Sequence, residues 1–404
     1  MPLIALVTLV TTVQALATFA VLTLSTLATL AAPHYGVGPE AIGYQISLVY
    51  GGAALLSSAA GVYIRRYGAA RMSAVSMAMS CIGLAGLASG SLVLGVLASI
   101  GIGFSYGLTN PAASHLLYRF SPAKWQNLIF SLKQTGVPIG GLLAALILPR
   151  IAEVHGWQIA ALSGAALAAA LAVTLLVVSL ATDDDKDPAA AVSTGSMLAG
   201  LKLVTSSPAL RGLSLMGLGY SSTQLCLFAF LITMLVKELG WSLVAAGTAA
   251  SLMQIGGVIG RIAWSVFADW LGEGRGPGVL VAIGVLSAAT GLCMTITSPH
   301  WPIWLTSALV FSLGFCLVGW NGLWLAEVAR AAGPGQVGVA TGGVLVFAFA
   351  GIVFGPAVFA TVYKWIGSYA ITFGVFSLNS IFGACALAWS RPRGSRPRAS
   401  RPSP

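Results

Sequence analysis

Residues 182–188 read Thr-Asp-Asp-Asp-Lys-Asp-Pro and form the most highly charged stretch of a chain that is otherwise strongly apolar. Of its 404 residues, 57% are hydrophobic and only 7% are charged, whereas a soluble globular protein carries about 25% charged residues. A membrane-spanning helix needs about 20 apolar residues. The chain therefore has room for about a dozen spans and for no sizeable soluble domain, and its charged stretch divides it into two equal membrane-embedded halves.

Apolar runs separated by turn signals predict twelve transmembrane helices, six on each side of the charged stretch. We expect an all-α membrane protein made of two pseudo-symmetric six-helix bundles. The predicted spans are 4–30, 41–63, 72–89, 92–118, 126–149, 158–181, 212–235, 243–268, 277–297, 303–326, 337–362 and 368–390. The predicted domains are an N-terminal bundle over 1–181, a cytoplasmic linker over 182–207, a C-terminal bundle over 208–390 and a disordered basic cytoplasmic tail over 391–404.

The two halves resemble each other at a constant offset of 211 residues, without a gap. This offset relates Gly103-Phe104 to Gly314-Phe315, Asn110 to Asn321, Arg119 to Arg330 and Gly156 to Gly367. Chance similarity among helices rich in glycine and alanine is the alternative reading. Duplication is the one we favour, and parallel six-helix repeats are typical of transporters that bind substrate between the halves near the middle of the bilayer.

The basic residues predict the orientation. If the N-terminus is cytoplasmic, fifteen of the twenty Lys and Arg residues lie in inner loops and the tail, and only Arg150, Lys237 and Lys364 lie at outer ends. Cytoplasmic loops carry such an excess. We therefore expect a multi-pass protein of a bacterial-type inner membrane with both termini cytoplasmic, and a tail attracted by anionic lipids.

Two basic residues remain, Lys133 and Arg261, and both are placed at the same depth inside predicted spans. Each such charge costs about 2.5–3.5 kcal/mol at the centre of a helix. No acidic residue is predicted at that depth, so a buried ion pair does not explain them. We expect a water-filled cavity in which an anionic substrate is the counter-ion; snorkelling to the interface and contact with backbone carbonyls are the alternatives.

Other polar and aromatic residues in the predicted spans are candidates to line this cavity, although helix packing explains any one of them equally well. The substrate-binding candidates besides the two cations are Gln14, Tyr106, Asn110, Gln134, Gln224, Trp320 and Asn321. His115 is a candidate for proton coupling. The polar run 131–141, which contains Pro138 and several glycines, predicts a bend that would suit a rocking helix; a plain packing kink is the alternative.

No function outside transport fits this composition. The five cysteines are scattered singly and no Cys/His cluster has ligand spacing, so we expect no metal and no cofactor. An enzyme needs a metal cluster or an acid/base pair, and the apolar segments offer neither. The positions of the basic residues are explained by membrane topology, so nucleic acid is not an expected partner. The expected partners are a small anion, protons and membrane lipids. The protein is expected to be a monomer.

The short loop after the second predicted span reads Gly61-Val62-Tyr63-Ile64-Arg65-Arg66-Tyr67-Gly68-Ala69-Ala70-Arg71. It resembles the signature loop of the major facilitator superfamily, although Arg65 stands where that loop has aspartate. The corresponding loop in the second half keeps Asp269, Gly272 and Arg275. The resemblance implies a cytoplasmic latch formed by Arg66, Gly68, Arg71, Asp269, Arg275, Glu327 and Arg330, with Asp269 pairing to Arg330 and Glu327 to Arg275 when the outward-open state is locked.

The stretch from Arg261 to Asp269 further resembles the oxalate and monocarboxylate branch of that family, in which an arginine of span eight binds the carboxylate. The oxalate carrier has its second cation in span eleven, where this chain has only Lys364 near the outer end, so Lys133 is expected to substitute for it. The expected function is alternating-access transport of a mono- or dicarboxylate with proton-coupled uptake. A drug or metabolite exporter of the same fold and an anion exchanger are the alternatives.

Overall fold

The fold is that of a computed structural model, which describes residues 2–122, 129, 132–184, 186, 196–272, 274–332 and 336–390. All regular structure in these residues is helical. The helices of the first half are α1 (Leu3–Thr26), α2 (Ala28–Ala31), η1 (Ala32–Tyr35), η2 (Pro39–Ala41), α3 (Ile42–Tyr67), α4 (Ala69–Ala88), α5 (Leu92–Phe120), α7 (Gly136–His155) and α8 (Trp157–Thr182). They are followed by α9 (Ser196–Ser206), α10 (Pro208–Lys237), α11 (Leu243–Leu271), α12 (Gly276–Cys293), η4 (Met294–Ile296), α13 (Ile303–Leu317), α14 (Asn321–Ala332), α15 (Val337–Ile366) and α16 (Tyr369–Trp389).

Within these described ranges, eleven helical segments are long and apolar enough to cross a membrane. A further segment, Pro39–Ser57 with Ala59–Tyr67, passes the same test as a pair bent by 47° and brings the number to twelve. The predicted fold class, an all-α protein with twelve spans, is therefore confirmed.

The fifth span differs most from its prediction. It runs over Leu132–His155 rather than 126–149, and residues 126–128, 130 and 131 of the predicted range lie outside the described residues. Pro149 does not end the helix, which continues to Gly156, where φ is +87°. Within the run 131–141 the helical turns are interrupted at Thr135, and Pro138 lies in the first turn of α7, where its missing N–H costs nothing.

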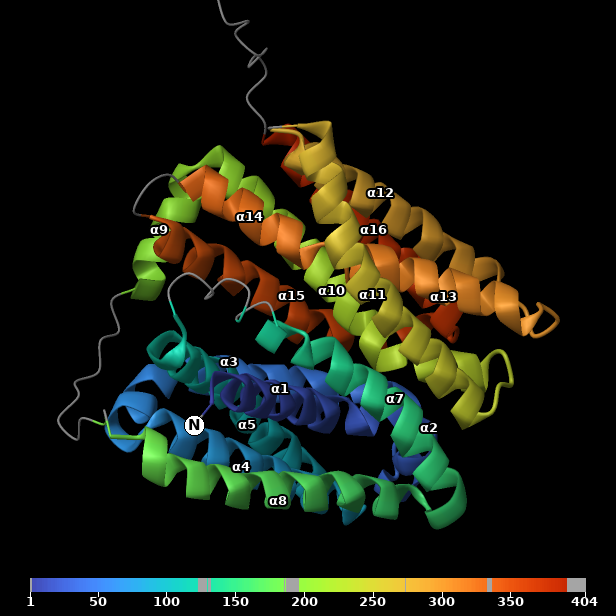
Figure 1. The fold of residues 1–404 in the computed structure, drawn as a ribbon. Helices are drawn as coiled ribbons and strands as arrows, with labels where there is room; N and C mark the ends of the chain where they lie inside the picture. The colour runs from blue at the N-terminus through green and yellow to red at the C-terminus, as the bar shows by residue number, and fades with distance from the viewer. Residues whose placement is uncertain are drawn as a thin grey trace, which may run out of the picture.

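The helices form two groups in Figure 1, with α1–α8 in the lower part and α10–α16 in the upper part of the view. In the first group α4 packs on α8 and α3 on α5, and in the second α10 packs on α15 and α16. Helix α9, in the predicted linker, packs against α15 through the backbones of Gly200 and Gly343. The remainder of that linker, residues 185 and 187–195, and the predicted tail lie outside the described residues.

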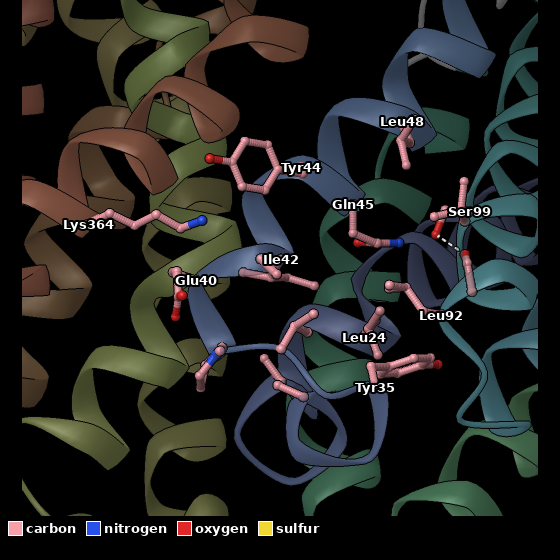
Figure 2. Close-up of a pocket in the computed structure, with 18 residues that line it drawn as sticks. Leu24, Tyr35, Glu40, Ile42, Tyr44, Gln45, Leu48, Leu92, Ser99 and Lys364 are labelled. Atoms are coloured by element: carbon pink, nitrogen blue, oxygen red, sulfur yellow. Dashed lines mark hydrogen bonds between the residues drawn. The ribbon is translucent and has the colours of Figure 1, made fainter.

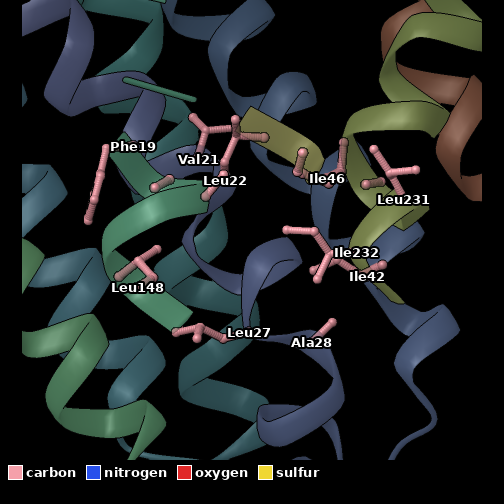
Figure 3. Close-up of a cluster of buried hydrophobic side chains, with 14 of the residues drawn as sticks. Phe19, Val21, Leu22, Leu27, Ala28, Ile42, Ile46, Leu148, Leu231 and Ile232 are labelled. Atoms are coloured by element: carbon pink, nitrogen blue, oxygen red, sulfur yellow. The ribbon is translucent and has the colours of Figure 1, made fainter. Parts of the chain in front are cut away.

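Three apolar clusters make up the core. We call the end of the molecule where α8 ends and α10 begins the linker end, and the opposite end the far end. At the linker end each half has its own cluster, around Leu116 in the first half and around Trp324 in the second. At the far end one cluster contains side chains of both halves; in Figure 3 Ile42 and Ile46 from the first half lie beside Leu231 and Ile232 from the second.

Glycines bring the halves together at this far end. A Cβ atom added at Gly43 of α3 would overlap the carbonyl oxygen of Pro356 in α15, and one added at Gly247 of α11 would overlap that of Ala145 in α7. Small residues permit this close approach of helix backbones. The two halves are therefore packed together at the far end, whereas their apolar cores are separate at the linker end.

Candidate functional site

Lys133 is buried, with only 2% of its surface exposed. It lies in the turn before α7, and its ammonium group donates a hydrogen bond to the side-chain oxygen of Asn110 on α5. The side chain therefore turns toward a neighbouring helix, and the snorkelling alternative does not describe it. Its hydrogen-bond partner is an uncharged amide.

Arg261 lies on α11 and donates from Nε to the carbonyl oxygen of Val318, at 3.2 Å. That carbonyl is available because the tenth span is broken at residues 318–320, between α13 and α14. The backbones of Gly260 and Gly319 are in contact at this break. The backbone carbonyl of Val318 thus accepts a hydrogen bond from one nitrogen of the guanidinium group. Contact with backbone carbonyls was one of the alternatives considered from the sequence.

One face of α5 connects the two cations. Asn110, which holds Lys133, follows Tyr106 by four residues, so the two side chains lie one turn or about 6 Å apart along the axis. The Tyr106 hydroxyl lies within electrostatic range of the Arg261 guanidinium. The Tyr106 ring also packs edge-on against Tyr50, with ring centroids 5.6 Å apart. Lys133 from one half and Arg261 from the other therefore approach adjacent turns of the same helix.

Helix α1 adds two polar side chains to this region. Gln14 is 0% exposed, and neither its amide nitrogen nor its amide oxygen has a hydrogen-bond partner among the described residues. Its Cβ and Cγ lie next to Gly136, three residues after Lys133. Thr18, one turn further along α1, interacts with Tyr106. Thr18 was not among the predicted site residues, and its spacing of four from Gln14 was the only sequence signal for it.

In the second half, Gln224 of α10 joins two other candidates. Its side-chain oxygen accepts from Nε1 of Trp320 at 3.0 Å and from Nδ2 of Asn321 at 3.4 Å. Asn321 Nδ2 also lies 3.5 Å from the carbonyl oxygen of Val318, the group that accepts from Arg261. These three predicted residues therefore support the broken segment that holds Arg261.

Two other predicted residues lie away from this cluster. The side chain of Gln134 is exposed, although it follows Lys133 directly. His115 is half-buried on α5, five residues beyond Asn110 toward the linker end, or about 7.5 Å along the axis.

The two cations have no acidic partner in the part of the chain that the structure describes. The ion pairs there join Arg119 to Asp184 and Arg330 to Glu327, both near the linker end. No group of three or more His, Cys, Asp or Glu side chains suited to a metal ion occurs in the same residues.

The signature loop of the first half is organised by Asp183 rather than by an acid of its own. The two carboxylate oxygens of Asp183 accept from the backbone N–H groups of Ala70 and Arg71, at 2.9 and 2.8 Å. Gly68, with φ +97°, is required there because a Cβ atom would overlap the Asp183 carboxylate. Arg66 lies over the ring of Tyr67, 5.6 Å from its centroid. Asp183 thus caps α4 at the loop where Arg65 replaces the usual aspartate.

The latch residues of the second half do not form here the pairs that were expected for the locked outward-open state. Arg330 is bonded to Glu327, three residues earlier on α14, and not to Asp269. Asp269 and Arg330 instead line a common hollow of about 460 Å³. The expected pair between Glu327 and Arg275 is also not formed. Because Glu327 lies one turn before Arg330 on the same helix, it reaches this arginine without any movement between helices.

Comparisons with known proteins agree with this architecture. The family model described as Major Facilitator Superfamily matches residues 7–356. An uncharacterised MFS-type transporter of Mycobacterium tuberculosis (strain CDC 1551 / Oshkosh) is 27% identical over 255 residues, which is 62% of this chain and 54% of that protein. A gallate transporter of Pseudomonas putida is 26% identical over 252 residues, 54% of this chain and 53% of that protein. The chain thus matches about half the length of these relatives.

Solved structures share the fold at low sequence identity. A point mutant of the nucleoside transporter NupG superposes with a TM-score of 0.74 at 15% identity, covering 95% of this chain and 99% of that one. A bacterial homologue of the human lysosomal transporter Spinster, in an inward-facing and occupied conformation, gives 0.69 at 14% identity, covering 95% and 94%. A D-xylose-proton symporter gives 0.67 at 16% identity, covering 96% and 97%.

Proposed function

The chain belongs to the Major Facilitator Superfamily, and from this premise we propose that it is a secondary transporter of a small organic anion, with Lys133 and Arg261 holding the carboxylate of the substrate. The observation that carries the proposal is the position of these cations. They come from opposite halves, approach adjacent turns of α5, and have no carboxylate partner in the described residues. A carboxylate between them would supply the missing charge to both.

The two cations differ in what they offer an anion. Arg261 uses Nε for the Val318 carbonyl, which leaves its terminal nitrogens to face a carboxylate as a fork. Lys133 offers a point charge that the Asn110 amide orients. Because each half contributes one cation, a bound anion is held by both halves at once, as alternating access about a central site requires.

Aromatic carboxylates are the first substrates to test. Tyr50 and Tyr106 present ring surfaces beside the α5 face that serves both cations, and an aromatic acid combines a carboxylate for the cations with a ring for these surfaces. The gallate transporter among the relatives handles a compound of this type.

We further propose that both termini and the linker are cytoplasmic and that transport is uptake coupled to protons. If the linker end is cytoplasmic, the two halves have separate apolar cores on the cytoplasmic side and share one core on the opposite side. This arrangement corresponds to an inward-facing state. Moving one negative charge inward against 100 mV costs about 2.3 kcal/mol, which a co-transported proton offsets. His115, on the linker side of Asn110, is the candidate carrier of that proton.

Binding to the purified protein tests the cation pair. We expect benzoate and 3,4,5-trihydroxybenzoate to raise the melting temperature, and the uncharged benzamide to have no effect. Arg261→Gln and Lys133→Gln each remove a charged hydrogen-bond donor and should weaken binding about 10–100-fold. Arg150→Gln, at the exposed far end of α7, is the matched control and should bind normally. Equal affinity for benzoate and benzamide would refute the proposal.

Counterflow in proteoliposomes tests the coupling separately. Proton symport predicts that labelled benzoate accumulates when the outside is acidic, and that a protonophore abolishes the accumulation. Accumulation that requires an anion inside the vesicles and does not depend on the pH gradient would identify an exchanger. This result would contradict the symport proposal but not the proposed binding site.

A further inference from the structure

A groove runs along α3 on the side of the molecule, away from the two cations. At the far end it is a pocket of about 430 Å³ between α3, η1, η2 and the start of α5. A second hollow shares Tyr44 and Leu48 with this pocket and continues along α3 to Leu55. We call the two together the lateral groove. From Ile42 to Leu55 it is about 20 Å long, compared with about 15 Å for one leaflet of a 30 Å hydrocarbon core.

The wall of the lateral groove carries a buried amide without a partner. Gln45 is 9% exposed, and both polar atoms of its amide lack a hydrogen bond in the described residues. In Figure 2 its side chain lies between α3 and α5, among Leu24, Leu48 and Leu92. A buried amide in an apolar wall is unfavourable unless a ligand supplies its hydrogen bonds.

Opposite charges lie at the mouth of the pocket. Glu40 comes from η2 in the first half, and Lys364 comes from α15 in the second. They line the same pocket, yet they are not within ion-pair distance of each other in the structure as described. The Lys364 ammonium lies 5.5 Å from the centroid of the Tyr44 ring. A negative and a positive group, separated across a mouth, are complementary to a ligand that carries both charges.

We propose that the lateral groove binds a bilayer phospholipid whose headgroup is zwitterionic and carries a primary amine. Lys364 contacts the phosphate, Glu40 accepts from the ammonium group, and the Gln45 amide bonds to an ester of the glycerol region. An acyl chain follows α3 past Gly51 to Leu55, whose side chain is exposed. Because Lys364 belongs to the second half and the other contacts to the first, the lipid joins the halves at the far end and stabilises their packed arrangement there.

Retention of lipid by the full-length protein tests this proposal. Protein reconstituted in equal amounts of phosphatidylethanolamine, phosphatidylcholine and phosphatidylglycerol is extracted in mild detergent, and its bound lipids are counted by native mass spectrometry. We expect one phosphatidylethanolamine to be retained preferentially. Gln45→Leu removes the amide, and Gly51→Leu fills the groove at a position where a Cβ atom meets no neighbour within 4 Å. Each should reduce this retention about ten-fold.

Matched controls separate the groove from general effects. Gly342→Leu adds the same side chain at a helical glycine of α15 that also has no neighbour within 4 Å of an added Cβ atom. Lys237→Gln removes an exposed far-end charge outside the groove, whereas Lys364→Gln should abolish the preference for a zwitterion. Monodisperse elution of each variant shows that it is folded. Equal retention of the three lipids by the wild type, or retention that Gly51→Leu leaves unchanged, would overturn the proposal. No readout here involves carboxylate binding, so this test and that of the transport function fail independently.

Discussion

The ammonium group of Lys133 is bonded to the side-chain oxygen of Asn110, so an uncharged amide is the polar partner of a cation that is almost completely buried. An amide orients the ammonium group but leaves its charge uncompensated. Asn110 and Asn321 are separated by the offset of 211 residues that relates the two halves in sequence, and Asn321 instead contacts Gln224. The two asparagines therefore provide a matched pair for testing the charge of the site.

Asn110→Asp should weaken benzoate binding about ten-fold or more. The new carboxylate would pair with Lys133 and take the place that we assign to the substrate anion. Asn321→Asp adds the same charge at the equivalent position of the other half, away from Lys133, and should have a smaller effect. Isothermal titration calorimetry measures both affinities; equal losses in the two variants would contradict the role of Lys133.

Arg261→Lys should retain the charge but bind carboxylate about ten-fold more weakly than the wild type. A lysine cannot reproduce a guanidinium that holds the Val318 carbonyl through one nitrogen and, as we propose, the substrate carboxylate through the two others. Arg261→Gln should be weaker still. The dissociation constant for carboxylate should increase from the wild type to Arg261→Lys and again to Arg261→Gln. Identical affinities of the wild type and Arg261→Lys would exclude the forked contact.

Gly247→Val should shift the protein away from the arrangement described here. The added side chain would overlap the Ala145 carbonyl and separate α11 from α7 at the far end. Gly101→Val, on α5, meets no neighbour within 4 Å and is the control. Double electron–electron resonance between spin labels at the linker ends of the two halves should show shorter distances for Gly247→Val alone. An unchanged distance distribution would show that far-end packing does not set the conformation.

Asp183→Asn should lower the melting temperature, because it weakens a cap that accepts two backbone N–H groups of α4; loss of such a cap costs about 1 kcal/mol. Asp184→Asn is the adjacent control. The hydrogen bond from Arg119 holds the pKa of Asp184 below its ordinary value, so this pair is complete at neutral pH and is lost only as the pH falls through that lowered pKa. Asp184 is exposed, however, and its substitution should change stability little. A larger decrease of the melting temperature for Asp184→Asn than for Asp183→Asn would contradict the capping role of Asp183.

Much of the helical fold could be predicted from the sequence, because apolar length alone determines where a chain can cross a bilayer. Errors in the predicted ends of the spans arose where a residue that usually ends a helix does not end it. Pro149 lies inside α7 and does not end it, since prolines are tolerated in membrane helices when neighbours satisfy the freed carbonyls. The break at residues 318–320 was not predicted, because Val318, Gly319 and Trp320 are apolar and ordinary in a span.

The site was predictable in its charges but not in its contacts. Lys133 and Arg261 were identified because buried charge is costly in a membrane. The partners of these cations depend on tertiary packing: the Val318 carbonyl is available only through an unpredicted break, and Thr18 resembles the other threonines of α1. The pairing of Arg330 with Glu327 likewise depends on conformation, because Glu327 is in reach in any state of α14 whereas Asp269 lies on another helix.

In the part of the chain that the structure describes, one apolar cluster is shared by both halves, and it lies at the far end. A rotation of the two halves about this contact would displace their linker ends most, because these ends lie farthest from it. Opening of the far end would instead separate this shared contact, so a covalent cross-link across it, for example an engineered disulfide, should stop the transport cycle without obstructing the path of the substrate.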